Sequence, residues 1–213
     1  TRKESSAASD VYKRQVMSGA RMHRSIKHAH WYAHVNGVQP SPQMRGWLTD
    51  SMSLTMKLIA RCEQFRIRRL VQQQAMALAD EFEMVALPRR RQVQEREVLL
   101  CCDDQPVVYA HTIVPLSATA ADWPFFGTLG ERSLGTTLFG DPKVWRGELE
   151  YARLSAQHPL AVRAAAALGQ ALPAPLYARR CLYRRGQGLL LVTEVFLPNL
   201  ATIRQNPHAE RKS

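Results

Sequence analysis

Apolar positions change their spacing along the chain, and each spacing predicts a different element. Between residues 97 and 114, two apolar runs flank the polar turn Asp103-Asp104-Gln105, which predicts a β-hairpin. Residues 177–183 and 189–197 repeat this arrangement across a turn rich in Arg and Gly. Residues 145–154 alternate like a single strand. The pattern therefore predicts strands that come mainly as antiparallel hairpins.

Helical spacing of apolar residues recurs in five segments between these strands. The first begins at Ser41-Pro42, a good helix start with Pro in the first turn. An extended stretch begins near residue 66, and residues 72–88 fit a strand or a helix equally well. Helices inserted between hairpins predict an α+β fold with a single antiparallel β-sheet and helices packed on it. The helical segments are residues 42–48, 54–65, 117–126, 133–139 and 159–172.

The same pattern divides the chain into a leader, one domain and a tail. Residues 1–40 show little apolar periodicity, and residues 10–15 resemble translated adaptor sequence, so we expect a disordered or non-native leader. The periodic body covers residues 41–200. A chain of 213 residues with 46% apolar content fits one globular domain. The polar residues at the end predict a flexible tail over residues 201–213.

The net charge of +11 first suggests a nucleic-acid partner, but its distribution favours another reading. The first 46 residues hold eight Lys/Arg against two acidic residues, which leaves 21 basic and 16 acidic residues in the rest. No zinc-finger spacing, basic zipper or aromatic stacking motif accompanies the basic runs. We therefore expect no nucleic-acid partner. An anionic small molecule would benefit from such a positive field.

The sequence argues against a membrane protein, an oxidising compartment, and a bound nucleotide or metal. Its longest apolar run is too short to span a bilayer, so we expect no stable membrane insertion. Its four cysteines form no C-x-x-C pair and indicate a reduced, cytoplasmic protein. The glycines match neither a dinucleotide-binding nor a phosphate-binding loop, and no Cys/His/Asp cluster has metal-ligand spacing. Catalysis here is expected to need no metal and no cofactor.

Two charged residues interrupt the most apolar strands. Glu194 shares a strand face with Leu190, Val192 and Phe196, where a carboxylate costs several kcal/mol unless it is paired or takes up a proton. Arg96 leads directly into the apolar run that starts at Val98. Opposite charges entering two buried strands suggest one buried site. The alternative is a purely structural role, in which Glu194 is the ion-pair partner of an arginine.

Six short blocks in the order expected for one known family carry a resemblance to it. They are Trp47-Leu48 with Ser53-Leu54-Thr55, Arg96-Glu97-Val98-Leu99-Leu100-Cys101, Thr112-Ile113-Val114-Pro115, Leu134-Gly135-Thr136-Thr137-Leu138-Phe139, Arg179-Arg180, and Leu190-Leu191-Val192-Thr193-Glu194-Val195-Phe196-Leu197-Pro198. These blocks span residues 42–200, and the chain resembles the chorismate pyruvate-lyase family of bacterial ubiquinone biosynthesis. Each block is moderately specific, and their shared order makes the resemblance strong.

The resemblance implies one antiparallel sheet with helical flaps over a buried site. It implies that Arg96 grips the ring carboxylate of chorismate and that Glu194 meets the hydroxyl end of the ring, both as catalytic residues. Leu134 corresponds to a position that gives a backbone N–H to the ligand, and Leu54 to a flap position covering it. Arg179 or Arg180 is a candidate contact for the departing pyruvate.

The implied activity is a cofactor-free carbon–oxygen lyase reaction that gives pyruvate and 4-hydroxybenzoate, and the protein is expected to be a monomer. The alternative is a small-acid-sensing domain of the same fold that binds its ligand without turning it over. Such domains normally follow a winged helix-turn-helix, for which residues 1–46 are too short and aperiodic.

Overall fold

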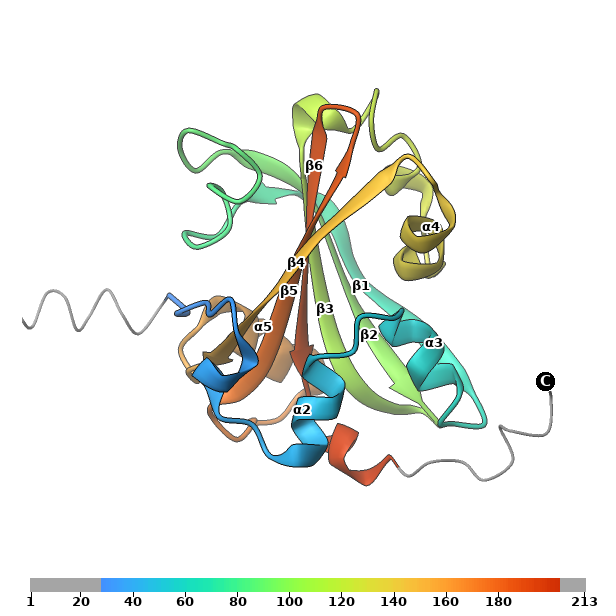
Figure 1. Cartoon of the computed structure of the whole chain (residues 1–213), viewed down its shortest axis with the longest axis vertical. Helices are drawn as coiled ribbons and strands as arrows, with labels where there is room; N and C mark the ends of the chain where they lie inside the picture. Colours follow the sequence, from blue (N-terminus) through green and yellow to red (C-terminus); the bar gives the residue numbers. More distant parts are fainter. Residues whose placement is uncertain (1–27, 204–213) are drawn as a thin grey trace, which may run out of the picture.

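A computed structural model describes residues 28–203, so the expectations for residues 1–27 and 204–213 lie outside the described residues. It contains one six-stranded antiparallel sheet with the strand order β1-β2-β3-β6-β5-β4 (Figure 1). The predicted α+β class is confirmed. The strands are β1 (Phe65–Met76), β2 (Gln92–Cys102), β3 (Gln105–Pro115), β4 (Val144–Leu154), β5 (Leu176–Arg185) and β6 (Gly188–Phe196).

Short helices and 3-10 turns connect the strands, and each α-helix has a local start signal. Ser41, Ser53 and Ser133 each accept a hydrogen bond from the backbone N–H three residues ahead, which caps the first turn. Gly169 ends the longest helix in the left-handed conformation, with φ of 64°. The elements are η1 (Val35–Val38), α2 (Pro42–Leu48), α3 (Leu54–Ile59), η2 (Leu116–Ala118), η3 (Phe126–Thr128), α4 (Leu134–Gly140), α5 (Pro159–Leu168) and η4 (Pro198–Thr202).

Both predicted hairpins are present, and they join side by side in the middle of the sheet. Asp103 and Asp104 connect β2 to β3 with positive φ at both positions, as a tight two-residue hairpin turn requires. The contact between the hairpins is formed by β3 and β6, from Val108 opposite Phe196 to Ile113 opposite Leu191. This pairing carries the central residues of both hairpins into one continuous surface.

Each face of the sheet is covered by different elements. Figure 1 shows α3 and α4 on one side and α5 with the β1–β2 connection on the other. The adjacent residues Cys101 and Cys102 belong to apolar clusters on opposite faces, as their strand alternation predicts. All four cysteines of the chain are free and buried. The sheet is therefore the middle of three layers.

Two predicted helices differ from the structure, and one stretch that the sequence left open is now assigned. Residues 117–126 form no α-helix; 3-10 turns and bends take their place, because Pro124 and nearby glycines interrupt the helical spacing. The helix beginning at Leu54 ends at Ile59, since Phe65 already starts β1. The ambiguous stretch 72–88 continues β1 to Met76 and then turns.

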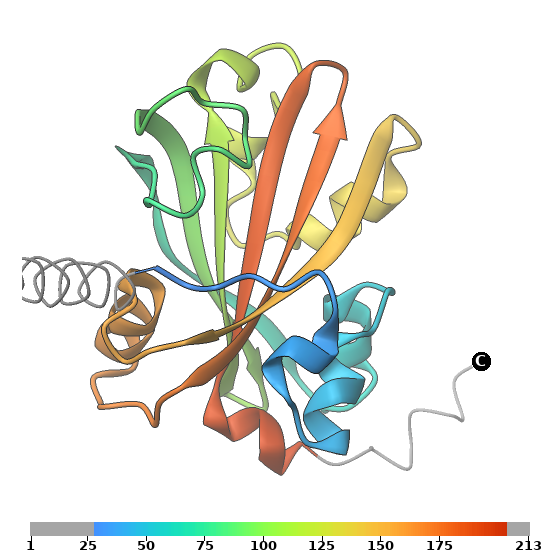
Figure 2. The same cartoon turned by 60° about the vertical axis from the view of Figure 1, so that its left-hand side comes forward.

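Residues before the expected domain start at 41 also pack on the sheet. Val35 and Val38 are buried in the core, and the backbone of Tyr32 pairs with Tyr151 at the free edge of β4. Figure 2 shows this segment crossing the strands of the sheet. Its contacts are to residues far along the chain, so no local periodicity revealed them. Covering β4 removes an exposed strand edge.

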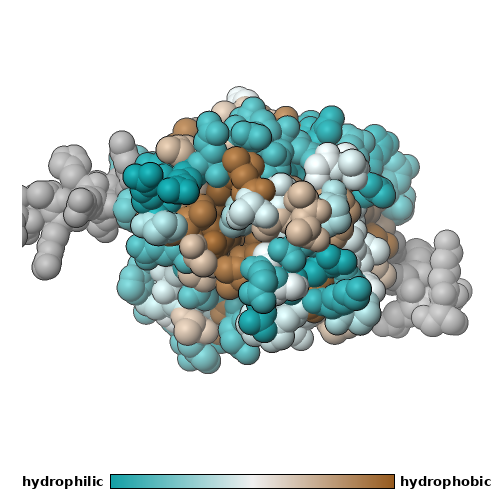
Figure 3. Space-filling view, turned by 90° about the horizontal axis from the view of Figure 1, so that it is seen from above, coloured by the Kyte–Doolittle hydropathy of each residue, from teal (hydrophilic) through white to brown (hydrophobic). Residues whose placement is uncertain are grey.

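The end of the molecule that carries the β1–β2 connection and the β5–β6 turn has a mixed surface. Seen from above, apolar side chains form a band across this end with hydrophilic side chains on either side (Figure 3). Arg89, Arg90 and Arg91 are exposed beside Leu87 and Leu116 at a groove there. Among the described helices, none has the length and apolar character needed to cross a membrane.

Candidate active site

A cavity lies between one face of the sheet and the helices α3 and α4. The first turns of both helices contribute its cover, together with Met52 and Phe139. Its floor is largely apolar and comes from all six strands. The floor residues are Ile67, Arg96, Val98, Leu100, Ala110, Thr112, Arg146, Leu149, Arg179, Cys181, Tyr183, Val192 and Glu194.

Arg96 enters this cavity from β2 as a buried cation with no acidic partner. Its side chain is 2% exposed, and Nη2 donates hydrogen bonds to the carbonyl oxygens of Gly130 (2.9 Å) and Arg132 (3.0 Å). Nε has no partner, and no ion pair to Arg96 occurs within residues 28–203. Burial, with a smaller contribution from Arg69, lowers the pKa of Arg96 to about 10. A buried cation in this state favours an anionic ligand.

Glu194 enters the same cavity from β6, but it is already paired. Its Oε2 accepts a 2.5 Å hydrogen bond from Nε of Arg179, its neighbour on β5. Nη1 of Arg179 donates to the carbonyl oxygens of Trp47, Leu48 and Asp50. These carbonyls lie at the C-terminal end of α2, where unsatisfied acceptors attract a cation. Arg179 therefore fixes the position of Glu194 relative to α2.

The strand register sets the separation between Arg96 and Glu194. Arg96 lies opposite Thr112, which lies opposite Val192, and Glu194 is two residues further along β6. Two strand spacings across and one pleat repeat along give roughly 12 Å between their Cα atoms. Both side chains point to the same face of the sheet, and both line the cavity. The sequence-based prediction of one shared site for both residues agrees with this geometry.

The predicted flap residues Leu54 and Leu134 lie at the first positions of α3 and α4, and both line the cavity. The hydroxyls of Thr55 and Ser133 are 3.1 Å apart and join the two helices directly. A Cβ added at Gly135 would lie 3.3 Å from Oγ of Ser53, which shows how closely the two helices approach here. The flaps are thus in contact above the cavity.

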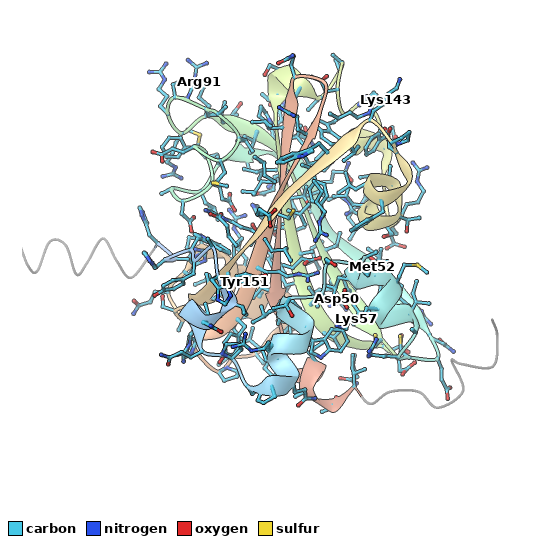
Figure 4. The ribbon with its side chains drawn as sticks, viewed as in Figure 1. Asp50, Met52, Lys57, Arg91, Lys143 and Tyr151 are labelled. Atoms are coloured by element: carbon cyan, nitrogen blue, oxygen red, sulfur yellow. The ribbon has the colours of Figure 1, made fainter. Side chains whose placement is uncertain are left out.

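An ion pair anchors the segment that leads into α3. Nζ of Lys57 lies 2.7 Å from Oδ2 of Asp50 and 4.8 Å from the centre of the Trp47 ring. Figure 4 shows Asp50, Met52 and Lys57 together beside α2 and α3. This contact joins the flap to the same helix end that Arg179 holds.

Of the two arginines considered for pyruvate, only Arg179 lines the cavity. Arg180 points to the other face, where it pairs with Glu150 at 2.6 Å and lies 4.3 Å from the centre of the Trp31 ring. The sequence interpretation missed Arg146, which lines the cavity from β4. Its alternation with the exposed Trp145 in a predicted strand was the signal that could have indicated it.

The opposite face of the sheet holds a second group of buried charges. Oxygens of Glu95 and Glu97 both lie near Nδ1 of His111, in an arrangement that could hold a metal ion. Nη1 of Arg163 already lies 2.7 Å from Glu95 and 2.6 Å from Glu97, and Nε2 of His111 lies 3.1 Å from Glu81. A cation from the chain itself thus takes the place of a metal. Cross-strand neighbours of this kind leave no spacing motif in the sequence.

Comparison with known proteins identifies the family. The model of the family described as chorismate lyase matches residues 25–205. A probable chorismate pyruvate-lyase of Ralstonia nicotianae is 46% identical over 199 residues, which cover 90% of this chain and 99% of the relative. One from Cupriavidus pinatubonensis is 47% identical over 162 residues, covering 76% of this chain and 84% of the relative. The chain belongs to the chorismate lyase family.

Solved structures of similar shape are much more distant. PhnF from Mycobacterium smegmatis has a TM-score of 0.48 and 14% identity, covering 71% of this chain and 66% of that one. The C-terminal domain of a histidine utilization repressor from Pseudomonas syringae has a TM-score of 0.47 and 13% identity, covering 64% of this chain and 93% of that one. Likenesses at this level carry no argument about what the present chain binds.

Proposed function

We propose that this protein is a chorismate pyruvate-lyase, which converts chorismate into 4-hydroxybenzoate and pyruvate and so supplies the ring of ubiquinone. The observation that carries the proposal is the buried Arg96, which has no ion-pair partner among the described residues and lines the same cavity as Glu194. Family membership supports the same reaction. The four free, buried cysteines fit a protein of the reducing cytoplasm.

The reaction needs little more than orientation and one proton transfer. The hydrogen leaves the hydroxyl-bearing ring carbon as a proton, and the electrons of that C–H bond form the new ring double bond. The neighbouring C–O bond breaks, its electrons leave with the enolpyruvyl oxygen as the enolate of pyruvate, and protonation of the enolate at its CH2 carbon gives pyruvate. Because the ring becomes aromatic, the step is strongly downhill, and positioned side chains without a cofactor suffice.

Arg96 is the proposed anchor of the ring carboxylate. Its free Nε and its guanidinium offer a charge-assisted contact, and the walls formed by Val98, Leu100 and Val192 exclude water from the ring. The backbone N–H of Leu134 is proposed to donate to the ligand, and Leu54 to close the cavity over it. Contact between the two flaps supports this closed arrangement.

Glu194 is proposed to act at the hydroxyl end of the ring. Its ion pair with Nε of Arg179 occupies one carboxylate oxygen, Oε2. Because the ion pair uses Oε2, the other oxygen, Oε1, is the proposed acceptor of the ring proton or of the hydroxyl hydrogen. We propose a base or positioning role for Glu194 through this oxygen.

Incubation with chorismate and detection of 4-hydroxybenzoate tests the activity directly. Glu194→Gln keeps the shape of the side chain but weakens the proton acceptor, and we expect turnover to fall by ~10²–10⁴-fold. Glu150→Gln is the matched control, because Glu150 also pairs with a strand arginine but lies on the opposite face. Wild-type turnover in a folded Glu194→Gln protein would show that its carboxylate is structural.

The same assay separates the enzyme from a small-acid sensor. A protein that binds 4-hydroxybenzoate tightly but leaves chorismate unchanged would support the sensing alternative. We propose that the protein acts as a monomer without nucleic-acid partners, and sedimentation at working concentration checks the monomer.

A further inference from the structure

Two cations without an acidic partner line the cavity, although 4-hydroxybenzoate carries only one carboxylate. The first is Arg96. The second is Arg146, whose Nε is buried without a hydrogen-bond partner and which forms no ion pair within the described part of the chain. Chorismate carries two carboxylates, one on the ring and one on the enolpyruvyl group.

Arg146 lies where the two covering segments meet. Its Nη1 donates to the carbonyl oxygen of Ser51, just before α3, and its guanidinium carbon lies 5.3 Å from the centre of the Phe139 ring on α4. Cys181 and Tyr183 are within hydrogen-bonding reach of it. These contacts hold the guanidinium at the cavity wall without neutralising its charge.

The register places Arg146 on the side where the departing group must extend. A ring held between Arg96 and Glu194 directs its hydroxyl end toward β6. The enolpyruvyl group is attached to the carbon beside the hydroxyl carbon, away from the ring carboxylate. Beyond β6 the sheet continues with β5 and β4, and Arg146 lies opposite Tyr183 there.

The other arginine on this side of the cavity is already occupied. Arg179 pairs with Glu194 through Nε and donates to three carbonyl oxygens through Nη1. Binding a substrate carboxylate through these atoms would require it to release Glu194 or the end of α2. Arg146 has a free Nε and needs no such rearrangement.

We propose that Arg146 binds the second carboxylate of the substrate, the one that leaves with pyruvate. This inference rests on the proposed function and deepens it. Because the contact exists only while the enolpyruvyl group is present, Arg146 discriminates the dianionic substrate from the monoanionic aromatic product. Once the C–O bond has broken, the carboxylate at Arg146 belongs to pyruvate, which can leave independently of the ring.

The test compares a dianion with a monoanion on the full chain. The probes are chorismate for turnover, 4-hydroxybenzoate for monoanion binding, and 3-(1-carboxyvinyloxy)benzoate, an aromatic dianion that cannot be aromatised further. For Arg146→Gln we expect roughly 10- to 150-fold weaker binding of the aromatic dianion and a similar fall in kcat/KM for chorismate. Binding of 4-hydroxybenzoate should stay within about twofold, which also shows that the variant is folded.

Two further variants sharpen the result. Arg146→Lys keeps the charge and should recover part of the dianion affinity. Arg184→Gln removes another arginine of the β4–β5 pair, stacked on the exposed Trp145, and should change neither ligand. Equal losses for both ligands in Arg146→Gln, or no loss for either, would overturn the inference. Wild-type protein that binds the dianion selectively but does not convert chorismate would instead overturn only the proposed function.

Discussion

The two faces of the sheet treat buried charge in opposite ways, and three consecutive residues show the difference. Glu95 and Glu97 point to one face, where Arg163 and His111 neutralise them. Arg96, between them, points to the other face, where no acidic group meets it. Buried charges with partners contribute to the fold, whereas a buried charge without one costs stability and favours a ligand. Within this triplet, pairing rather than burial alone separates the two structural carboxylates from the functional guanidinium.

Arg96→Gln is expected to give the largest effect and to act on binding. Losing a buried charge contact costs about 2–5 kcal/mol, which is ~30- to ~5,000-fold in affinity for 4-hydroxybenzoate. The free energy of unfolding of the ligand-free protein should stay the same or rise, because an unpaired buried cation is removed. Calorimetric titration and denaturant unfolding measure both quantities. Unchanged affinity would rule Arg96 out as the anchor.

Arg163→Met is the corresponding change on the opposite face, and it should act on stability. It leaves the carboxylates of Glu95 and Glu97 together without their shared cation. We expect the free energy of unfolding to fall by about 3 kcal/mol, the lower end for a buried pair because Arg163 is partly exposed. Turnover per folded molecule should not change. A stable variant with impaired turnover would contradict the division between the two faces.

The pH dependence of stability should report the opposite face as well. Burial would lower the pKa of His111, but Glu81 and Glu97 raise it from 6.5 to about 10. Its contribution is therefore complete below pH 6.5 and is lost as the pH rises through about 10. Unfolding measured between these values should show a decline in the wild type and a flatter curve in His111→Gln. Equal slopes would show that His111 is neutral in the fold.

At acidic pH the free energy of unfolding should change in the opposite direction and rise with pH. Burial would raise the pKa of Glu97, but His111, Tyr109 and Arg163 lower it to about 2. The pKa of Asp80 is also about 2, because hydrogen bonds from His158 and Trp31 outweigh its burial. Both contributions are present above the ordinary carboxyl range and are lost as the pH falls toward 2. Acid unfolding should therefore begin only below about pH 4.

The smallest expected effect concerns the cover of the cavity. Thr55→Val removes the hydroxyl that contacts Ser133 while keeping the shape of the side chain. Losing one hydrogen bond of about 1 kcal/mol should speed release of 4-hydroxybenzoate by ~5-fold. Thr119→Val, which also loses a hydroxyl hydrogen bond but lies at the end of η2, is the matched control. Stopped-flow displacement gives both rates, and identical rates would mean that flap contact does not limit release.

Local patterns predicted the parts of the fold that local forces determine. Alternation and turn residues indicated both hairpins, and Ser41-Pro42 marked the start of α2. The pairing of β3 with β6 and the packing of residues 28–40 depend on contacts distant in sequence, which periodicity does not encode. The helix predicted over residues 117–126 does not form. There the apolar spacing is helical, but proline and glycine prevent a continuous helix.

The candidate site was predictable to a similar extent. Glu194 and Arg96 were recognisable because each is a charge in an apolar run, and the family resemblance added Leu54 and Leu134. The pairing of Glu194 with Arg179 requires the strand register, which the sequence does not specify. Arg146 resembles any alternating strand arginine until the flaps are in place around it.

The alternation Glu95-Arg96-Glu97 also has a consequence for how the sheet assembles. If β2 slipped by one residue against β3, the two carboxylates would enter the apolar cavity and the guanidinium would leave it. Arg163 and His111 would then lose their anionic partners at the same moment. A shifted register is therefore strongly destabilised by these three residues alone. The residues that prepare the site for its ligand thus also help to select the native pairing of β2 with β3 during folding.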